Sequence, residues 1–437
     1  MSARTSLADL SRRLPFGVGT MVFVLVAAML IAVGWVLATG SPDQATTIYS
    51  GGQLRGYPTQ PAVAWTQSSD TLPGYGANTG IEVADTWRGR WLLAYPSGLG
   101  RAFLLVDRAT GKPVWHHAVA VGLGGCAITE SGQVGCAVRI GGVPDGFYLV
   151  DDDGVPGSRS ALDDTARVVG VGPNYLRIDQ AGYRVDLRSP DGHEIWSRTF
   201  AAAAQARYSS NGLLTISTVD GARFVLDPAT GRDQVTCTQC EITVFDDGIT
   251  LQHNELGHES VAGYAIIDGR LSTRPTFVSP SLQVVGGPST LAVLTGTGPD
   301  QVDATQGRYE IRDPARAHAL WQITDAELSK ANTKPCGTMV AFALKDRSRA
   351  IYTLTDGKRV GRVDPPAVDN PDVNIDQLSC VGSSGSTLVF ADPDQITAYD
   401  ADDGHVAWTR SVIGITEAVD GYVVVHEGTS LTVLQPR

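Results

Sequence analysis

Residues 102–115 read AFLLVDRATGKPVW, and residues 396–408 read ITAYDADDGHVAW. In both stretches an apolar run ends at an Asp, with a Gly four residues later and a Trp eight residues later. The apolar run is typical of a strand, the Asp can accept backbone N–H bonds within a turn, and the Gly supplies the positive φ of a tight turn. Each stretch therefore predicts a strand, a turn and a second strand, with a Trp able to pack between neighbouring sheets.

The same pattern recurs along the chain. Eight Asp residues that end apolar runs, namely Asp107, Asp151, Asp186, Asp227, Asp268, Asp313, Asp356 and Asp400, follow one another at intervals of 44, 35, 41, 41, 45, 43 and 44. A period near 42 indicates a repeat protein. Two more candidate strands precede most of these turns, and four short strands per unit predict the blade of an all-β propeller. The residues expected in repeat turns and blade packing are Asp107, Gly111, Trp115, Asp186, Gly192, Trp196, Asp227, Gly231, Asp313, Trp321, Asp400, Gly404 and Trp408.

The two ends of the repeat region complete each other. PAVAWTQ, with Trp65, resembles a blade's last strand without its turn, and YVVVHEG and SLTVLQ at the other end supply strands without a successor. A shared closing blade would remove the sheet edges. Eight Asp units and this blade suggest nine blades. However, propellers typically have four to eight, and the short interval from Asp151 to Asp186 contains the weak segment VPGSRSALDD. We expect eight blades, with nine as the alternative.

The stretches DRATGKPVW and DADDGHVAW resemble the PQQ-like β-propeller repeat family, which includes quinoprotein dehydrogenases and BamB-like propellers. The resemblance covers roughly residues 61–437 and implies the fold more strongly than a function, because this repeat is a scaffold on which sites are built. BamB is a lipoprotein anchored through an N-terminal Cys, whereas this chain has no Cys before Cys126. A role in outer-membrane assembly therefore does not transfer.

Residues 14–40 form an almost wholly apolar stretch without a charged residue. This length predicts a transmembrane helix, and we interpret it as an uncleaved signal anchor; the alternative is a cleavable signal peptide. Arg4, Arg12 and Arg13 precede the stretch, so residues 1–13 are predicted to be cytoplasmic and the propeller, residues 61–437, extracytoplasmic. Residues 41–60 are rich in Gly, Ser, Thr and Pro and are expected to form a flexible stalk.

The formal charge of the chain is −12. Three Arg and one Asp lie before residue 14, which leaves −14 on residues 41–437. This acidic balance argues against nucleic acid or anionic lipid as a partner of a basic surface. Residue usage, with scarce Lys and abundant Arg, Ala, Gly and Asp, is typical of a high-GC bacterium.

All six Cys follow the membrane segment, and an even number on the oxidising side predicts disulfides. Cys126 and Cys136 flank a hairpin turn and would face each other, and Cys336 and Cys380 hold similar places in successive units. Cys237 and Cys240 are then the two cysteines left to pair with each other. Their Cys-x-x-Cys spacing also fits thiol exchange, but strands flank it where a redox site has a helix, which favours a structural disulfide.

No catalytic set is apparent. The family's dehydrogenases bind PQQ and calcium and carry a disulfide between adjacent Cys, and this chain has no adjacent Cys pair. Residues 151–154 and 400–404 cluster carboxylates beside a Gly, so calcium is an alternative there, although these are also repeat turns. The leading hypothesis is a non-enzymatic scaffold that binds an envelope or membrane protein, or a cell-wall component. The alternative is a ligand-binding or PQQ-dependent enzyme with its site in the funnel.

Overall fold

The computed structural model describes residues 49–76, 80–161, 164–253, 260–280, 282–296, 307–329, 332–364, 375 and 377–437. Within these residues the chain forms nine antiparallel sheets, which we number as blades 1 to 9. Blade 1 contains β2 (Glu82–Trp87), β3 (Arg90–Ser97), β4 (Gly100–Asp107) and β5 (Val119–Gly122). Blade 2 contains β6 (Gly125–Ile128), β7 (Val134–Val138), β8 (Gly146–Val150) and β9 (Pro156–Ala161). Blade 3 contains β10 (Thr165–Val171), β11 (Asn174–Asp179), β12 (Arg184–Arg188) and β13 (Glu194–Thr199).

The next three blades follow the same order. Blade 4 contains β14 (Ala204–Tyr208), β15 (Leu214–Thr218), β16 (Ala222–Leu226) and β17 (Asp233–Thr238). Blade 5 contains β18 (Cys240–Phe245), β19 (Gly248–His253), β20 (Ser260–Ile267) and β22 (Phe277–Pro280), with the two-residue β21 (Arg270–Leu271) paired to the end of β20. Blade 6 contains β23 (Leu282–Val284), β24 (Ala292–Gly296), β25 (Gly307–Arg312) and β26 (Trp321–Asp325).

The last three blades bring the chain back to its start. Blade 7 contains β27 (Lys334–Cys336), β28 (Met339–Ala343), β29 (Arg349–Thr353) and β30 (Arg359–Val363). Blade 8 contains β31 (Ser379–Ser384), β32 (Thr387–Ala391), β33 (Gln395–Asp400) and β34 (Val406–Ser411). Blade 9 contains β35 (Ile415–Val419), β36 (Tyr422–Glu427), β37 (Ser430–Leu434) and β1 (Val63–Gln67).

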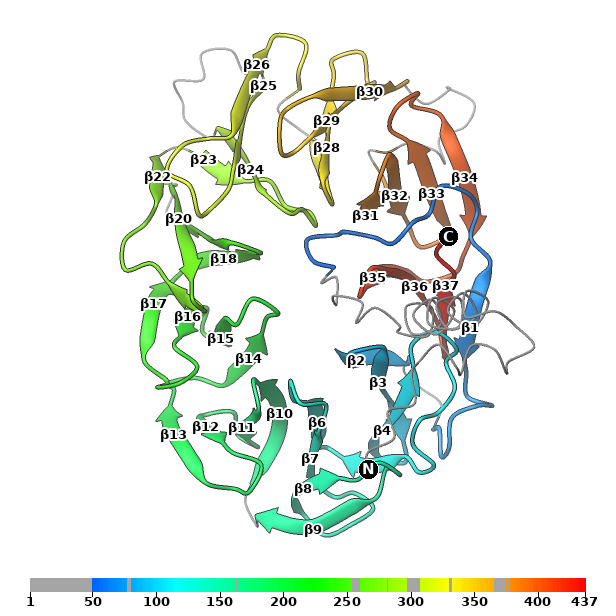
Figure 1. Cartoon of the computed structure of the whole chain (residues 1–437), viewed down its shortest axis with the longest axis vertical. Helices are drawn as coiled ribbons and strands as arrows, with labels where there is room; N and C mark the ends of the chain where they lie inside the picture. The colour runs from blue at the N-terminus through cyan, green and yellow to red at the C-terminus, as the bar shows by residue number, and fades with distance from the viewer. Residues whose placement is uncertain are drawn as a thin grey trace, which may run out of the picture. The chain divides into compact units, whose positions relative to one another are not determined.

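The blades follow one another around a ring, with the first strand of each blade toward the centre and the fourth outside (Figure 1). Small apolar cores lie between neighbouring sheets, for example between blades 7 and 8 and between blades 8 and 9. Nine blades in the described residues make the expectation of eight wrong and the alternative of nine correct. The segment VPGSRSALDD, which suggested a miscount, contributes β9, the outer strand of blade 2.

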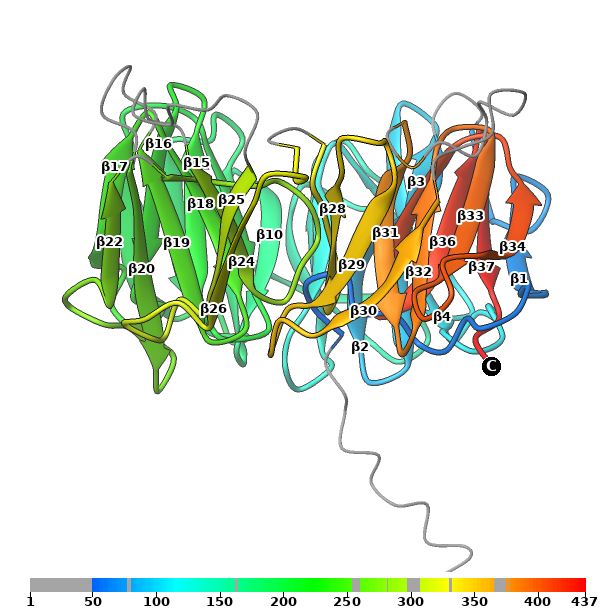
Figure 2. The ribbon, with the colours of Figure 1, turned by 90° about the horizontal axis from the view of Figure 1, so that it is seen from above.

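Strand alternation gives the ring two faces (Figure 2). One face carries the turns between the first and second strands and between the third and fourth strands of each blade. We call it the strap face, after a segment described below. The opposite face carries the turns between second and third strands and the connections between blades, and we call it the crossover face.

The repeated Trp and Gly residues pack against each other across blade boundaries. Trp65 Nε1 donates to Arg108 O at 2.7 Å, in the next blade's turn between the third and fourth strands. Gly111 in that turn has a φ of +66°, and a Cβ there would lie 2.5 Å from the Trp65 ring. Trp196 repeats this contact with Gly231, donating to Pro228 O at 2.9 Å. Only Gly lets the turn approach the ring this closely while adopting a positive φ.

The repeat Asp residues divide into two groups. The carboxylate Oδ1 of Asp107 accepts Thr110 N at 2.9 Å inside its turn. The other carboxylates that accept backbone N–H groups within their turns include Asp227, Asp313 and Asp400. Asp186 does not belong to this group, contrary to expectation: it lies within β12, buried, and its carboxylate pairs with Arg184 and Arg188. Ser189 takes the turn position in blade 3, because its N–H bonds to His193 O across the turn.

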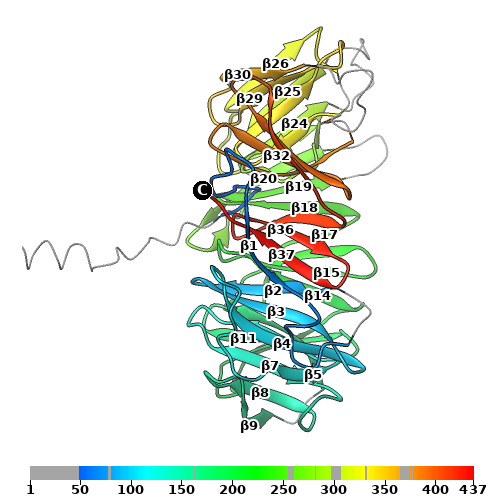
Figure 3. The ribbon, with the colours of Figure 1, turned by 90° about the vertical axis from the view of Figure 1, so that its right-hand side faces the viewer.

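The closing blade joins the two ends of the repeat region, as the sequence predicted. β1 pairs antiparallel with β37, with Thr66 opposite Thr432, and the two strands lie side by side in Figure 3. Because this blade's third and fourth strands come from opposite ends of the chain, no turn joins them. Tyr57 occupies that place. Its backbone O accepts a hydrogen bond from Trp408 Nε1 of blade 8 at 2.9 Å, which corresponds to the contact that Trp65 makes with a turn.

Tyr57 also ties blade 9 together through its side chain. The hydroxyl donates to Leu434 O at 3.1 Å and accepts Val423 N at 3.0 Å, so it bridges β37 and β36. The residue is 1% exposed, and burial raises the pKa of the phenol well above its usual range.

Residues 49–58 form a segment that we call the strap. Its Gln53 pairs in parallel with Ser383 of blade 8, and Arg55 N donates to Gly421 O of blade 9. Ser50 Oγ reaches across the centre of the ring to Asp246 Oδ1 of blade 5 at 2.5 Å. The strap therefore belongs to the folded unit, and the stalk expected at 41–60 does not extend over these residues. Residues 41–48, like the predicted tail and anchor, lie outside the described residues.

Candidate interaction surface

The most exposed large apolar side chains gather on one face. Among the described residues, the five that rank highest in exposure all lie on the crossover face, and they are Leu99, Ile413, Ile140, Val219 and Ile415. Leu99 is 98% exposed at the tip of a turn in blade 1, and Ile413 is 79% exposed between blades 8 and 9. An exposed apolar side chain gains nothing for folding, so these residues are candidates for contact with another molecule.

Two of these side chains, Leu99 and Ile140, come from adjoining turns of blades 1 and 2, and the exposed Leu123 lies between those turns. Leu123, 57% exposed, follows Gly122, whose φ of +63° brings the chain so close to the backbone of Arg139 and Ile140 that no Cβ fits. Leu123 N donates to Arg139 O at 2.8 Å. Gly122 also abuts Gly100, the neighbour of Leu99. The backbone segments that carry Leu99, Leu123 and Ile140 therefore lie side by side on the crossover face.

Ile140 is an unusual residue at its position. It is 74% exposed and has a φ of +56°, a region that β-branched residues rarely adopt. Its backbone N donates to Asp145 Oδ1 at 2.7 Å, which holds the loop. Gly or Asn would fit this conformation with less strain and Ser would suit the exposure. Neither folding nor solubility explains an Ile here.

Two clefts connect blade 9 to its neighbours. The first, of 710 Å³, lies between blades 9 and 1 and is lined by Tyr95, Pro96 and Ile415 among others. The second, of 570 Å³, includes Ile413 and Glu427. We call the surface formed by Leu99, Leu123, Ile140, Ile413 and Ile415, together with these two clefts, the apolar rim.

His426 fixes the wall of the first cleft across the closure of the ring. Its Nδ1 lies 2.9 Å from Ile81 O of the segment that enters blade 1, and its Nε2 lies 2.8 Å from Glu417 Oε1. Both partners are acceptors, so the protonated imidazole donates to both of them from its two nitrogens. The hydrogen bond to Glu417 is the largest cause that raises the pKa of His426.

The centre of the ring holds two further cavities, of 690 and 790 Å³. Both are bordered by the hairpin of β14 and β15, including Arg207, and the first is also bordered by Ser50 of the strap. Charges of both signs line them, for example Arg223 and Glu241. Among the described residues, no group of three His, Cys, Asp or Glu side chains is placed to hold a metal ion.

All six cysteines form disulfides. Cys126–Cys136 joins β6 to β7 within blade 2. Cys237–Cys240 joins the end of β17 to the start of β18, so it fastens the connection between blades 4 and 5 rather than a hairpin turn. The structural disulfide favoured for this Cys-x-x-Cys pair is therefore present.

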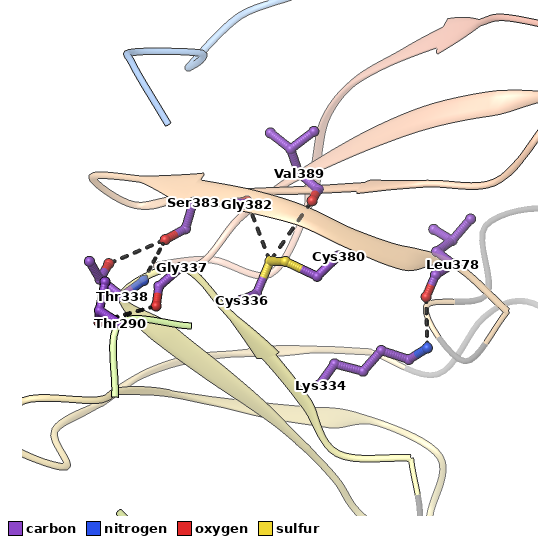
Figure 4. The surroundings of a disulfide bond; sticks show 10 residues. All are labelled: Thr290, Lys334, Cys336, Gly337, Thr338, Leu378, Cys380, Gly382, Ser383 and Val389. Atoms are coloured by element: carbon purple, nitrogen blue, oxygen red, sulfur yellow. Dashed lines mark hydrogen bonds between the residues drawn. A yellow bond between two sulfur atoms is a disulfide. The ribbon is translucent and has the colours of Figure 1, made fainter. Parts of the chain in front are cut away.

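Cys336–Cys380 joins the innermost strands of blades 7 and 8 (Figure 4). Polar contacts support the bond on either side. Thr338 N donates to Ser383 Oγ at 2.9 Å, and Lys334 Nζ donates to Leu378 O at 2.7 Å. The third disulfide thus crosses a blade boundary beside Ser383, the residue that the strap also contacts.

The carboxylates considered for calcium serve their own turns. Asp151 Oδ1 accepts hydrogen bonds from the backbone N–H groups of Asp153 and Val155, and Asp403 Oδ1 accepts one from His405 N.

Among the described residues, no helix is long and apolar enough to cross a membrane, and residues 14–40 lie outside them.

The topology makes the described part of the chain a nine-bladed β-propeller. No protein-family model matches the sequence, and no curated protein does. The chain is similar to several solved structures. BamB from Moraxella catarrhalis is 14% identical, with a TM-score of 0.40 over 86% of this chain and 98% of that one. The computationally designed Ika8 protein is 12% identical, with a TM-score of 0.39 over 89% and 100% of the two chains. The Dos1 propeller is 9% identical, with a TM-score of 0.39 over 86% and 95%.

The apolar rim has no clear signature in the sequence. Leu99 is a single Leu inside a turn of small residues, SGLG at 97–100, whereas Ile413 and Ile415 flank one Gly in VIGI at 412–415. An apolar residue at the tip of a tight turn, where polar residues are usual, was the available signal. This signal indicates a shared surface only once the fold is known, because the fold brings the turns of blades 9, 1 and 2 together.

Proposed function

We propose that this protein is a membrane-anchored, extracytoplasmic scaffold of the bacterial cell envelope, which binds another envelope protein through the apolar rim. The observation that carries the proposal is that the five most exposed apolar side chains lie on one face, and that two of them, Ile413 and Ile415, line clefts there. Protein interfaces have such an apolar centre with a polar margin.

Two features of the chain support this arrangement. The strap lies against the turns of blades 6 to 9 on the strap face, which is the face opposite the rim. The apolar residues 14–40 and the preceding Arg residues support an anchor with the propeller outside the cytoplasm. The three disulfides suit an oxidising compartment.

The proposal is tested by crosslinking in cells. A photoreactive residue is placed in the full-length chain at Leu99 or Ile413 in the rim, or at Ile267, which is 60% exposed on the strap face. We expect one dominant protein adduct from the two rim positions and none of that mass from position 267. Equal adducts from all three positions, or no protein adduct from the rim, would contradict the proposal.

A second candidate is ligand binding at the centre of the ring, which the cavities of 690 and 790 Å³ favour. Cavities of this size accommodate a small organic molecule. Native mass spectrometry of the purified protein tests this candidate directly. A bound small molecule that is lost from an Arg207→Ala variant would support a ligand site beside β14, whereas an unmodified mass would oppose it.

A further inference from the structure

We infer that the apolar rim binds a basic polypeptide segment, in which Lys or Arg residues flank apolar ones. This inference rests on the proposed function and specifies the chemistry of the partner. It comes from the combination of apolar anchor points with an excess of carboxylates over blades 8, 9 and 1.

The first cleft provides an apolar floor for such a segment. Tyr95 and Pro96 of blade 1 face Ile415 of blade 9 across its 710 Å³. Tyr95 is buried and its hydroxyl donates to Pro73 O at 2.9 Å, so its ring is held in place. The exposed Leu99 lies three residues after Pro96 in the sequence, and the exposed Ile413 lies two residues before Ile415. The apolar positions thus extend over more than one side chain's length, which suits an extended segment rather than a single residue.

Carboxylates outnumber cations around this floor. The described charged residues that line the two clefts, together with those of the adjoining turn 392–394, are Glu82, Arg101, Glu417, His426, Glu427, Asp392 and Asp394. Five are acidic and two are basic, even with His426 charged. The turn 392–394 is joined to the rim, because Val412 N donates to Asp394 O at 2.9 Å and Gly414 N to Pro393 O at 2.8 Å.

The arrangement of these charges leaves negative potential toward solvent. His426 is mostly shielded, with 19% of its side chain exposed, whereas its partner Glu417 is 49% exposed. Glu82 pairs with Arg101 at 2.9 Å at the surface, where such a pair is weak and can exchange partners. Among the described residues, Glu427 and Asp394 form no ion pair. A basic segment would therefore find carboxylates on both sides of an apolar floor, and charge complementarity would orient it.

The same charges disfavour a lipid surface. Apolar turn tips also occur in proteins that insert into membranes, but an anionic bilayer would be repelled by this excess of carboxylates and by the −14 of residues 41–437. A protein segment is therefore the occupant that the charges favour, and lipid is an outcome that the experiment distinguishes.

The experiment uses the full-length protein in cells with the photoreactive residue at position 99. The crosslinked partner peptide is identified by mass spectrometry. We expect a segment with more Lys and Arg than Asp and Glu, next to apolar residues. A partner segment that is neutral or acidic would overturn the inference while leaving the proposed function intact, and adducts with lipid alone would overturn both.

A pair of matched variants tests the role of the charges. The rim variant removes three carboxylates from the rim and the adjoining turn, through the combined substitutions Glu82→Gln, Asp394→Asn and Glu427→Gln. The control variant removes three exposed carboxylates from turns of the strap face, through the combined substitutions Asp152→Asn, Asp268→Asn and Asp402→Asn. Both variants have the same net charge, so a general electrostatic attraction would weaken equally in both. We expect the yield of the partner adduct to fall about tenfold in the rim variant alone. An equal fall in both variants, or no fall in the rim variant, would refute the inference.

Discussion

Tyr57→Phe tests the closure of the ring at the level of one hydroxyl group. The change leaves the aromatic ring in its buried place and leaves the backbone O of residue 57 available to Trp408 Nε1. It removes only the group that donates to Leu434 O and accepts Val423 N. The variant therefore separates the contribution of this bridge from that of packing.

The magnitude follows from the two groups that lose their partner. Val423 N–H and Leu434 C=O lie in the closing blade, and Tyr57 itself is 1% exposed, so water does not replace the hydroxyl without rearrangement. A buried polar group left without a partner costs about 1–3 kcal/mol, and a carbonyl with a second lone pair lies at the low end. We expect a loss of about 2–4 kcal/mol in the free energy of unfolding. This is a large part of the roughly 5–15 kcal/mol that stabilises a typical protein.

The assay is urea unfolding of residues 41–437, followed by Trp fluorescence with the disulfides intact. The midpoint should fall by about 0.5–1 M, because the urea dependence of a protein this large exceeds about 3 kcal/mol/M. Tyr183→Phe is the control: this tyrosine is 46% exposed, and its loss should shift the midpoint little. If both variants unfolded at the wild-type midpoint, Tyr57 would not connect β36 and β37 as described.

Three further predictions concern the same closure and its neighbours. Deletion of residues 61–67 removes β1 and should lower the temperature of thermal unfolding; an unchanged temperature would mean that the terminal strands do not close the ring. Replacing both Cys336 and Cys380 with Ser should cost about 2–4 kcal/mol in denaturant unfolding, because this disulfide closes a loop with a sequence separation of 44, and an unchanged midpoint would contradict it. His426 has a raised pKa in the folded protein, so its contribution to stability is complete below the unfolded value of about 6.5 and is lost as the pH rises through the folded value. The urea midpoint should therefore fall more steeply above about pH 6.5 in the wild type than in His426→Gln, and parallel pH profiles would refute this role.

The fold could be predicted from the sequence because its repeat is carried by contacts with strict requirements. A turn that must pass under a Trp ring needs Gly, so Gly111 and Gly231 recur with Trp65 and Trp196 one blade earlier. The alternation of short apolar runs with turn residues gave the four strands, and the unpaired strands at the two ends indicated the closing blade. The pairings of the six cysteines followed from their places in this repeat.

What could not be predicted depends on contacts without a local pattern. Asp186 resembles the turn residues in sequence, but it lies three residues too early, inside β12, where two Arg residues compensate its burial. The number of blades was underestimated because β9 has the composition of a loop. Tyr57 lies in a polar segment and is buried only because blade 9 lacks a turn at that point. The apolar rim, likewise, joins turns that are separated by more than 300 residues in the sequence.

The closing blade has a consequence for the order in which the protein can mature. β1 and the strap are made before any other part of the propeller, yet their partners β36 and β37 are the last strands to be synthesised. Until β36 and β37 have been made, β1 has an open edge and Tyr57 lacks its hydrogen-bond partners. A cell that makes this protein must keep that early edge from pairing with other chains until β37 has been synthesised.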